Sequence, residues 1–331
     1  MNVRKAMQRL VLSAAGLAIL MAAAECGAAP REVGKETLAK DASWDGEVLV
    51  TGDVHVPEGV TLTIAPGTTV RFRKIGAESN RNMFGIDSPY YPQAEIIVTG
   101  RLIARGTAEK PILFTSAETK PQPADWAALN FLGSHGNVVE NCRLEYAYNG
   151  VHAHGAQVLI KDDTFVKNAV AISVKKEEEA KGTPGFGIPA DITVTGNLIE
   201  DNKGGINVRS SRAVITRNTI RNNTFFGIWI KEQCRGEISS NDITANQKGI
   251  FFYKAEGMTI TANNIYSNHS YNLAVADEQG RDIQAAGNWF GTTSRAEIDE
   301  LVFDGKTDPA VARIVVLPFL PERVRDAGKG R

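Results

Sequence analysis

NLIEDNKGGINVR (residues 197–209), NTIRNNTFFGIWIK (218–231) and NDITANQKGIFFY (241–253) repeat one pattern. In each stretch an Asn is followed two residues later by Ile and five residues later by a second Asn, and alternating apolar positions come after. Self-similarity at a period near 22 residues is typical of stacked short coils rather than of a globular sheet. The leucine-rich repeat is the obvious competitor at this period, but its L-x-x-L-x-L-x-x-N pattern is absent.

Two columns of residues carry the repeat along the chain. The first column is Cys142, Asp163, Asn197, Asn218, Asn241, Asn263 and Asn288, and the second is Asn168, Asn202, Asn223, Asn246 and Asn268. Of the 21 Asn in the chain, 18 fall between residues 130 and 288, so Asn is concentrated where the repeat runs. Asn tolerates left-handed backbone geometry and bonds to neighbouring backbone groups, and stacked Asn side chains can bond to one another. We therefore interpret the Asn columns as structural bend and ladder positions rather than as a catalytic set.

The pattern resembles the right-handed parallel β-helix superfamily, which includes pectate-lyase-like folds and periplasmic proteins related to NosD. GEVLVTGDVHVPEGVTLTIAPGTTVRF (46–72) and GRLIARGTAEKPILFTS (100–116) are similar to the entry module of bacterial secreted β-helices. GNWFGTT (287–293) is similar to their closing segment. The resemblance implies an all-β fold, a single-stranded right-handed parallel β-helix with an N-terminal cap and a short helix-and-strand cap at the C-terminus.

The chain divides as follows. We expect a signal peptide over residues 1–24, a linker over 25–39, an N-terminal cap with the first coils over 40–125, the main repeats over 126–290, a C-terminal cap over 291–320 and a disordered tail over 321–331. Insertions at 74–94 and 175–189 interrupt the rhythm, and loops on a rigid scaffold are where function tends to lie.

The N-terminus predicts export. Arg4, Lys5 and Arg9 precede an apolar run of fifteen residues, Leu10–Ala24, which suits a signal peptide and is shorter than the roughly 20 residues of a membrane span. No transmembrane helix is expected in the mature chain. Cys26 follows Ala23-Ala24-Glu25, which resembles a lipoprotein box. The sequence therefore leaves open a periplasmic, a secreted or a lipid-anchored outer-membrane location.

Charge and cysteine content exclude some classes. Lys and Arg number 37 against 38 Asp and Glu, a net charge of -1, which argues against a strongly basic nucleic-acid binder. Three cysteines do not form a disulfide framework, so Cys142 and Cys234 are predicted to be free thiols, buried or half-buried.

Aligning the coils also aligns the outward residues of one strand face. The aligned side chains are cationic, aromatic or able to form hydrogen bonds: His152, His154, Lys175, Asn207, Arg209, Trp229, Lys231, Phe251 and Tyr253. We call these nine residues the stripe. Aromatic faces stack on sugar rings, and Arg and Lys meet acid groups. The stripe predicts non-catalytic binding of an anionic polysaccharide or another cell-envelope component.

Two alternatives remain. A polysaccharide lyase or another carbohydrate-active enzyme would use Lys175, Arg209 or Lys231. Asp162-Asp163 is the only tight acidic pair in the repeats, and its side chains should diverge. A NosD-like maturation or scaffold protein would use His152 and His154, which share a face and could bind copper with further ligands, for which His135 is the nearest candidate. No cofactor is required by the sequence, and calcium or copper are the ions these alternatives would use.

Overall fold

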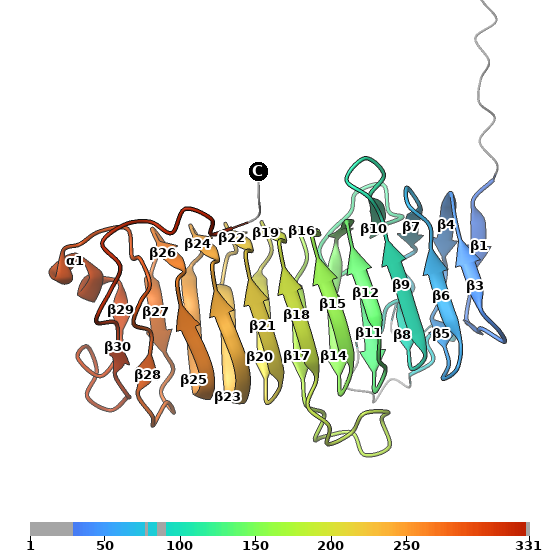
Figure 1. The fold of residues 1–331 in the computed structure, drawn as a ribbon. Coiled ribbons are helices and arrows are strands. Elements are labelled where there is room, and N and C mark those ends of the chain that lie inside the picture. The colour runs from blue at the N-terminus through green and yellow to red at the C-terminus, as the bar shows by residue number, and fades with distance from the viewer. Residues whose placement is uncertain (1–28, 77–78, 85–90, 329–331) are drawn as a thin grey trace, which may run out of the picture.

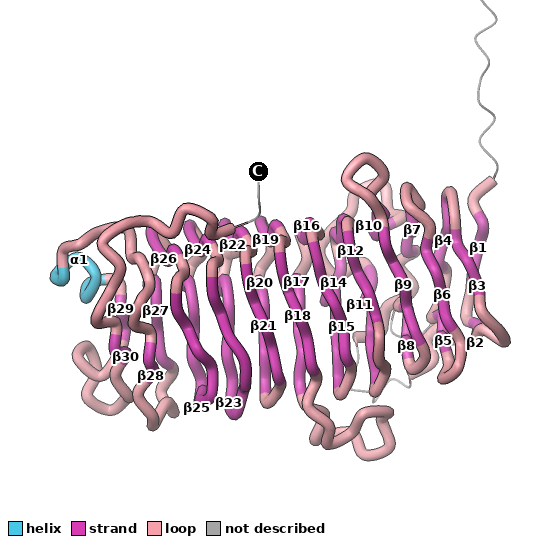
Figure 2. The backbone as a smooth tube through the Cα atoms, in the orientation of Figure 1, coloured by secondary structure: helices cyan, strands magenta, loops and turns pink. Residues whose placement is uncertain are grey.

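The computed structural model describes residues 29–76, 79–84 and 91–328. The predicted signal peptide and Cys26 lie outside these residues. The described chain forms a rod of stacked coils whose strands all pair in parallel, with one short helix near the C-terminal end (Figure 1, Figure 2). This is a parallel β-helix, as the sequence predicts.

Each coil has three faces. The first face is a sheet of ten short strands, β1 (Arg31–Val33), β4 (Glu47–Val50), β7 (Thr69–Phe72), β10 (Ile112–Ser116), β13 (Cys142–Glu145), β16 (Thr164–Val166), β19 (Leu198–Glu200), β22 (Thr219–Arg221), β24 (Asp242–Thr244) and β26 (Asn264–Tyr266).

The second face carries the stripe. Its strands are β2 (Glu36–Thr37), β5 (Val54–Val56), β8 (Ile96–Val98), β11 (Trp126–Leu132), β14 (Ala147–His154), β17 (Val170–Lys175), β20 (Gly204–Arg209), the first halves of β23 (Phe226–Ser239) and β25 (Lys248–Thr261), β27 (Tyr271–Val275) and β29 (Val302–Phe303).

The third face consists of β3 (Ala42–Trp44), β6 (Thr61–Ile64), β9 (Arg101–Arg105), β12 (Asn137–Glu140), β15 (Gln157–Lys161), β18 (Asp191–Thr195), β21 (Arg212–Thr216) and the second halves of β23 and β25. Strands β28 (Ile283–Gln284) and β30 (Ile314–Val315) pair near the C-terminal end, and α1 (Arg295–Glu300) begins after Ser294, whose hydroxyl accepts from the Glu297 backbone N–H.

Alternation along the strands builds the core. On the third face Val194, Ile215, Ile238 and Ile260 stand in register on adjacent coils and are at most 4% exposed. Each fully buried aliphatic side chain contributes roughly 1.5–3 kcal/mol relative to exposure to water. The core is therefore one continuous column along the rod, to which every coil adds a layer.

The Asn columns form two buried hydrogen-bonded ladders. Asn218 Oδ1 accepts hydrogen bonds from the backbone N–H and the side-chain amide of Asn197, at 3.0 and 2.9 Å. The backbone N–H and the side-chain amide of Asn218 donate in the same way to Asn241 Oδ1. The second ladder runs in the same way from Asn168 to Asn268 and ends on Asn272. The ladders satisfy the polar groups of turns that face the core, where an unpaired group would be costly.

One detail of the turns differs from the expectation. The residue in the left-handed region is the one before each ladder position, as at Arg217 (φ 55°), Ser240 (φ 56°) and Ala262 (φ 55°). The ladder Asn itself must point inward to reach its neighbours, so the sharp bend falls on the outward residue that precedes it. The expectation that the ladder Asn adopt left-handed geometry is therefore wrong.

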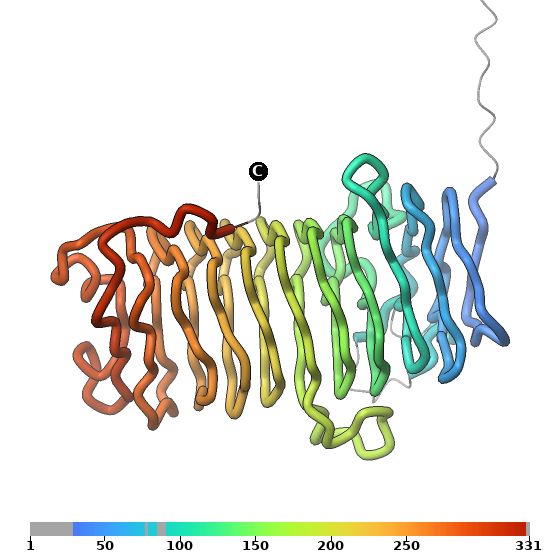
Figure 3. The backbone as a smooth tube through the Cα atoms, viewed as in Figure 1, coloured from blue at the N-terminus to red at the C-terminus, as the bar shows by residue number. Residues whose placement is uncertain are grey.

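The ends of the rod also differ from the expectation. Residues 31–37, predicted to be a linker, form β1 and β2 of the first coil. The tail predicted to be disordered runs back along the coil tops over β26 and β24 (Figure 3). Its contacts include Val324 N–H to Asn264 Oδ1 at 2.9 Å, an ion pair of Arg323 with Asp242, and Gly328 N–H to Ser240 O at 2.9 Å.

Candidate functional site

Parallel pairing places the stripe residues in two columns on the second face. His152, Ser173, Asn207, Trp229 and Phe251 follow one another in register, one coil apart. The neighbouring column is His154, Lys175, Arg209, Lys231 and Tyr253. Adjacent coils are spaced by about 4.8 Å, so each column is a row of side chains along the rod. The structure divides these rows into a covered part and an open part.

The covered part is centred on His154, with the half-buried His152 beside it. His152 Nε2 lies 2.9 Å from His154 Nε2, and His154 Nδ1 lies 3.1 Å from Glu177 Oε2 in the insertion after β17. Lys175 Nζ contacts the same Glu177 oxygen at 3.2 Å. His154 is 1% exposed and Glu177 is fully buried. The prediction that His154 lies on an exposed strand face is therefore wrong, because the insertion covers it.

Burial decides the charge of this pair. Burial lowers the pKa of His154 to about 3 and, with the neighbouring charges, lowers the pKa of His152 well below its ordinary value. Burial alone would raise the pKa of Glu177, but the Ala180 and Glu179 backbone N–H donors and Lys175 outweigh it and leave the pKa lowered. Both imidazoles are thus neutral at pH 7 beside an ionised carboxylate. The His154 proton belongs on Nδ1, since a lone pair there would face the carboxylate.

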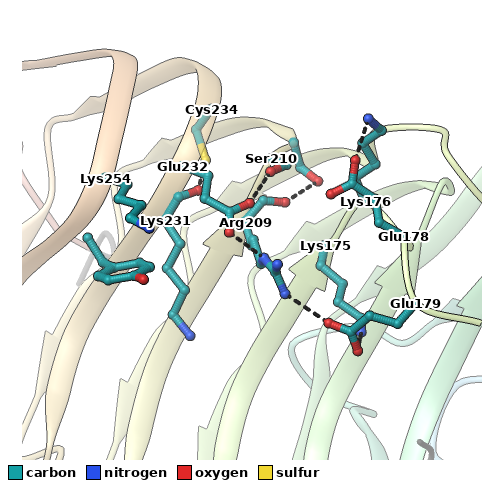
Figure 4. Close-up of polar contacts among 12 residues, drawn as sticks. Lys175, Lys176, Glu178, Glu179, Arg209, Ser210, Lys231, Glu232, Cys234 and Lys254 are labelled. Carbon is teal, nitrogen blue, oxygen red and sulfur yellow. Dashed lines mark hydrogen bonds and ion pairs between the residues drawn. The ribbon is translucent and has the colours of Figure 1, made fainter. Parts of the chain in front are cut away.

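The positive charge of the stripe is cancelled by acids that the sequence interpretation overlooked. Arg209 Nε lies 2.8 Å from Glu232 Oε1, and its Nη1 lies 3.3 Å from Glu179 Oε1 (Figure 4). Lys175 pairs with Glu177 and Glu179. Lys175 and Arg209, two of the cations expected to meet an anionic polymer, are therefore already paired with acids. The acidic run at residues 177–179 was visible in the sequence, but nothing in the repeat says that the insertion folds onto the stripe.

The open part is aromatic. Lys231 Nζ lies 3.5 Å from the centre of the Trp229 ring, and the Trp229 and Phe251 rings are 5.3 Å apart. Phe225, which the sequence analysis missed, packs edge-on against Trp229 at 5.7 Å. Burial lowers the pKa of Lys231. The sequence signal for this contact lay seven residues after the first Asn of a repeat, where Phe225 follows Asn218 and Lys248 follows Asn241.

A hollow of about 390 Å³ adjoins these rings. Its lining includes Lys248, Phe251, Tyr253, Tyr271 and Phe303. Lys248 Nζ lies 5.0 Å from the Phe251 ring centre, and the Tyr253 hydroxyl hydrogen-bonds Glu278 Oε1 at 3.1 Å. We call Phe225, Trp229, Phe251, Tyr253, Tyr271 and Phe303 the aromatic patch. All six side chains are half-buried, so each keeps an accessible part of its ring.

Carboxylates are placed poorly for catalysis along the stripe. Asp163 is fully buried in the first ladder and accepts from the Cys142 N–H, whereas Asp162 lies in the turn beside Lys161. Asp53 and Glu95, also missed by the sequence analysis, are buried on the second face near the N-terminal end. Burial raises the pKa of Asp53 to about 6 and raises that of Glu95, which Asp53 raises further. Neither reaches the surface that a polymer could contact.

Metal ligands are few. In residues 29–76, 79–84 and 91–328, no three His, Cys, Asp or Glu side chains are grouped so as to hold a metal ion. His135 does not complete the pair; it lines a separate cavity with His55 and Arg101.

Cys142 and Cys234 are free and buried, as predicted. No helix in the described part of the chain is long and apolar enough to cross a bilayer.

Comparison with known proteins gives two family matches. The model of a pectate-lyase-like β-helix domain matches residues 36–146, and that of the periplasmic copper-binding protein NosD matches residues 122–303. No curated protein and no solved structure matches. The second match spans 182 of the 331 residues, more than half of the chain. The protein therefore belongs to the NosD family of the right-handed parallel β-helix superfamily.

Proposed function

We propose that this protein is an exported, non-catalytic β-helix that binds a glycan across the aromatic patch. The observation that carries the proposal is the set of six half-buried aromatic side chains, four of which (Phe251, Tyr253, Tyr271 and Phe303) line a hollow of about 390 Å³, while Trp229 and Phe225 continue from Phe251. Aromatic rings offer flat apolar faces for sugar rings and pair best with ligands that are apolar on one side and wet on the other. The Tyr253 hydroxyl, Lys231, Lys248 and Glu278 supply hydrogen-bonding groups at its margin.

The ion pairs of the stripe bear on whether the bound glycan is anionic or neutral. Arg209 and Lys175 are already paired with Glu232, Glu177 and Glu179, so a polyanion would have to displace these acids or be repelled by them. A neutral or weakly charged chain meets no such barrier. The proposal therefore keeps the binding function expected from the sequence and replaces the anionic polymer with a neutral one.

Binding assays on two matched variants test the proposal. Trp229→Ala should weaken binding of neutral cell-envelope or plant oligosaccharides at least tenfold, because it removes the central ring of the patch. Arg209→Ala should leave that affinity within about twofold. Retention of glycan binding by Trp229→Ala would overturn the proposal. Preferential binding of acidic glycans that is lost in Arg209→Ala would instead support the original prediction that the stripe binds an anionic polysaccharide.

A copper-related role is the second candidate, because the family is that of a periplasmic copper-binding protein and the histidine pair is the observation that favours it. Two imidazole nitrogens face each other at 2.9 Å, and Glu177 contacts the outer nitrogen of His154 as an orienting partner would. The set lacks the further donors that a closed copper site uses, so these residues do not by themselves fit a resident centre. Stoichiometric copper uptake that disappears in His152→Ala would favour this role over glycan binding.

A lyase activity stays a prediction. Burial lowers the pKa of Lys231, which is the direction that favours a general base, whereas Lys175 and Arg209 are held in ion pairs. Formation of unsaturated uronides from acidic polysaccharides would support a lyase, and Lys231→Ala should then abolish it.

A further inference from the structure

We propose that the two insertions enclose a second binding site, separate from the aromatic patch, which takes an amphipathic ligand with an apolar body and an anionic head. A cavity of about 750 Å³ lies on the second face near the N-terminal end of the rod. Met83 and Phe84 of the first insertion and Pro184 and Gly185 of the second insertion line it together. Its volume falls within the range of roughly 300–1,000 Å³ that small-molecule sites occupy.

The floor of the cavity is apolar where a solenoid surface is ordinarily polar. Ile97 and Leu132 point outward from β8 and β11, on the opposite side from the core, yet are only 5% and 1% exposed. Met83 and Phe84 pack against them and form an apolar cluster apart from the core. Outward apolar side chains on a strand face indicate that something covers that face. Met83, Phe84, Pro184 and Gly185 provide part of the cover, and the cavity of about 750 Å³ lies between the described residues.

Close backbone contact fixes the second insertion over this floor. A Cβ atom on Gly185 would lie 2.6 Å from the His154 carbonyl oxygen and 2.8 Å from the Gly133 amide nitrogen. Gly185 also has φ of 80°, which side-chain-bearing residues rarely adopt. Gly185 therefore brings the insertion into direct contact with the loop after β11. The wall of the cavity is a packed part of the fold.

Polar and charged side chains also line the cavity and indicate which polar group the ligand would carry. Arg101 donates through Nε to the Gly136 carbonyl at 3.0 Å and, among the described residues, forms no ion pair. His135 and one acid, Glu58, also line the cavity. His55 Nε2 lies 2.8 Å from the Thr99 hydroxyl and is occupied there. Arg101 lines both this cavity and a neighbouring hollow on the third face, and an apolar floor with a guanidinium at its edge, in no ion pair among the described residues, suits a carboxylate at the end of an acyl chain or fused-ring body.

Calorimetric titration with sodium decanoate and 1-decanol tests the site, because the two probes share an apolar chain and differ in charge. Wild type should bind decanoate more tightly than decanol. Arg101→Gln should weaken decanoate binding at least tenfold and leave decanol unchanged. Arg105→Gln is the matched control: it lies on the same strand, pairs with Glu140, and does not line the cavity, so it should bind like wild type.

A substitution that fills the cavity tests whether the two probes bind inside it. Val60 lines the cavity and is half-buried, so Val60→Trp should abolish binding of both probes while thermal unfolding shows an intact fold. Failure of wild type to bind either probe, or binding that Val60→Trp does not change, would overturn the site. Equal affinity of Arg101→Gln and wild type for decanoate would contradict the proposal that the ligand has an anionic head that Arg101 binds. Both results are independent of glycan binding by Trp229→Ala.

Discussion

At the residue scale, each interior ladder asparagine is held in place by several buried hydrogen bonds. Each interior Oδ1 accepts two hydrogen bonds from the preceding coil, and each Nδ2 also donates to a backbone carbonyl, as Asn218 does to Val194 at 2.9 Å. All of these atoms are buried. An aspartate or a serine at the same position could not supply both the acceptor and the donors.

Asn218→Ala should lower the free energy of unfolding by about 3–5 kcal/mol, because it leaves two buried donors of Asn197 and an acceptor on Val194 without partners. Asn222→Gly is the matched control, because Asn222 is exposed and has φ of 57°, so glycine there should be neutral or slightly stabilising. Denaturant unfolding measures both changes. A loss below about 1 kcal/mol in Asn218→Ala would contradict the ladder's structural role.

The buried carboxyls predict a pH dependence. The pKa of Asp53 rises from 3.8 to about 6 on folding, so the folded chain binds a proton more tightly than the unfolded chain between these values. Stability should therefore fall as pH rises through this window, by up to about 3 kcal/mol from this group. Glu95, with its pKa also raised, adds to the same slope.

Glu95→Gln should remove its share of that slope. The variant should match wild type near pH 4 and exceed it in unfolding free energy at pH 8, because an amide needs no proton to stay neutral. Unfolding curves at several pH values measure the difference. Glu47→Gln, at an exposed ion pair with Arg71, should show no such gain at high pH. A wild-type advantage at pH 8 would contradict the raised pKa of Glu95.

At the element scale, strand register could be predicted from the sequence and insertion contacts could not. The columns through Arg209 and Trp229 follow from counting residues from the ladder positions once one extra residue is allowed in the coil after Asn218, because backbone pairing keeps neighbouring coils in register. The insertions obey no repeat, so their partners depend on contacts far apart in the sequence, such as Gly185 with Gly133. The cancelled charges of Lys175 and Arg209 were missed for this reason.

Replacing residues 176–190 by Ser-Ser should convert the stripe into a cationic surface. In the next coil Ser210-Ser211 alone joins Arg209 to Arg212, and these residues are in register with Lys175 and Asp191, so the shorter connection fits the coil. The variant loses Glu177 and Glu179 and uncovers the histidine pair. Retention on a heparin column at low salt should increase, and Glu178→Gln, which removes one exposed acid that pairs only with Lys176 in the described structure, should change it little. Unchanged retention would mean that the insertion does not mask Lys175 and Arg209.

At the scale of the whole molecule, the rod is a series of coils in which each contacts mainly its neighbours. Stability in such an architecture is close to a sum of coil and interface terms, and the ends fray first. The C-terminal tail contributes to the stability of this end, because it fastens two neighbouring coils through Ser240 and Asp242 on one and Asn264 on the other.

Truncation after Glu322 should loosen the C-terminal coils selectively. The change removes the tail contacts to β24 and β26 and leaves the N-terminal coils untouched. Hydrogen exchange should accelerate in β24, β26 and β27 and stay the same in β5, β8 and β11. Uniform acceleration along the rod would contradict coil-by-coil stability, and no acceleration would show that the tail contacts contribute little.

The ladders have a consequence for how this gene can change. An interior coil presents the same acceptor to the coil before it and the same donors to the coil after it, as Asn218 does between Asn197 and Asn241. An in-frame duplication or loss of one repeat therefore leaves every hydrogen bond of the ladder with a chemically identical replacement. The length of the rod can drift through evolution by whole coils, while the covered histidines, the cavity and the closing tail keep their own local surroundings.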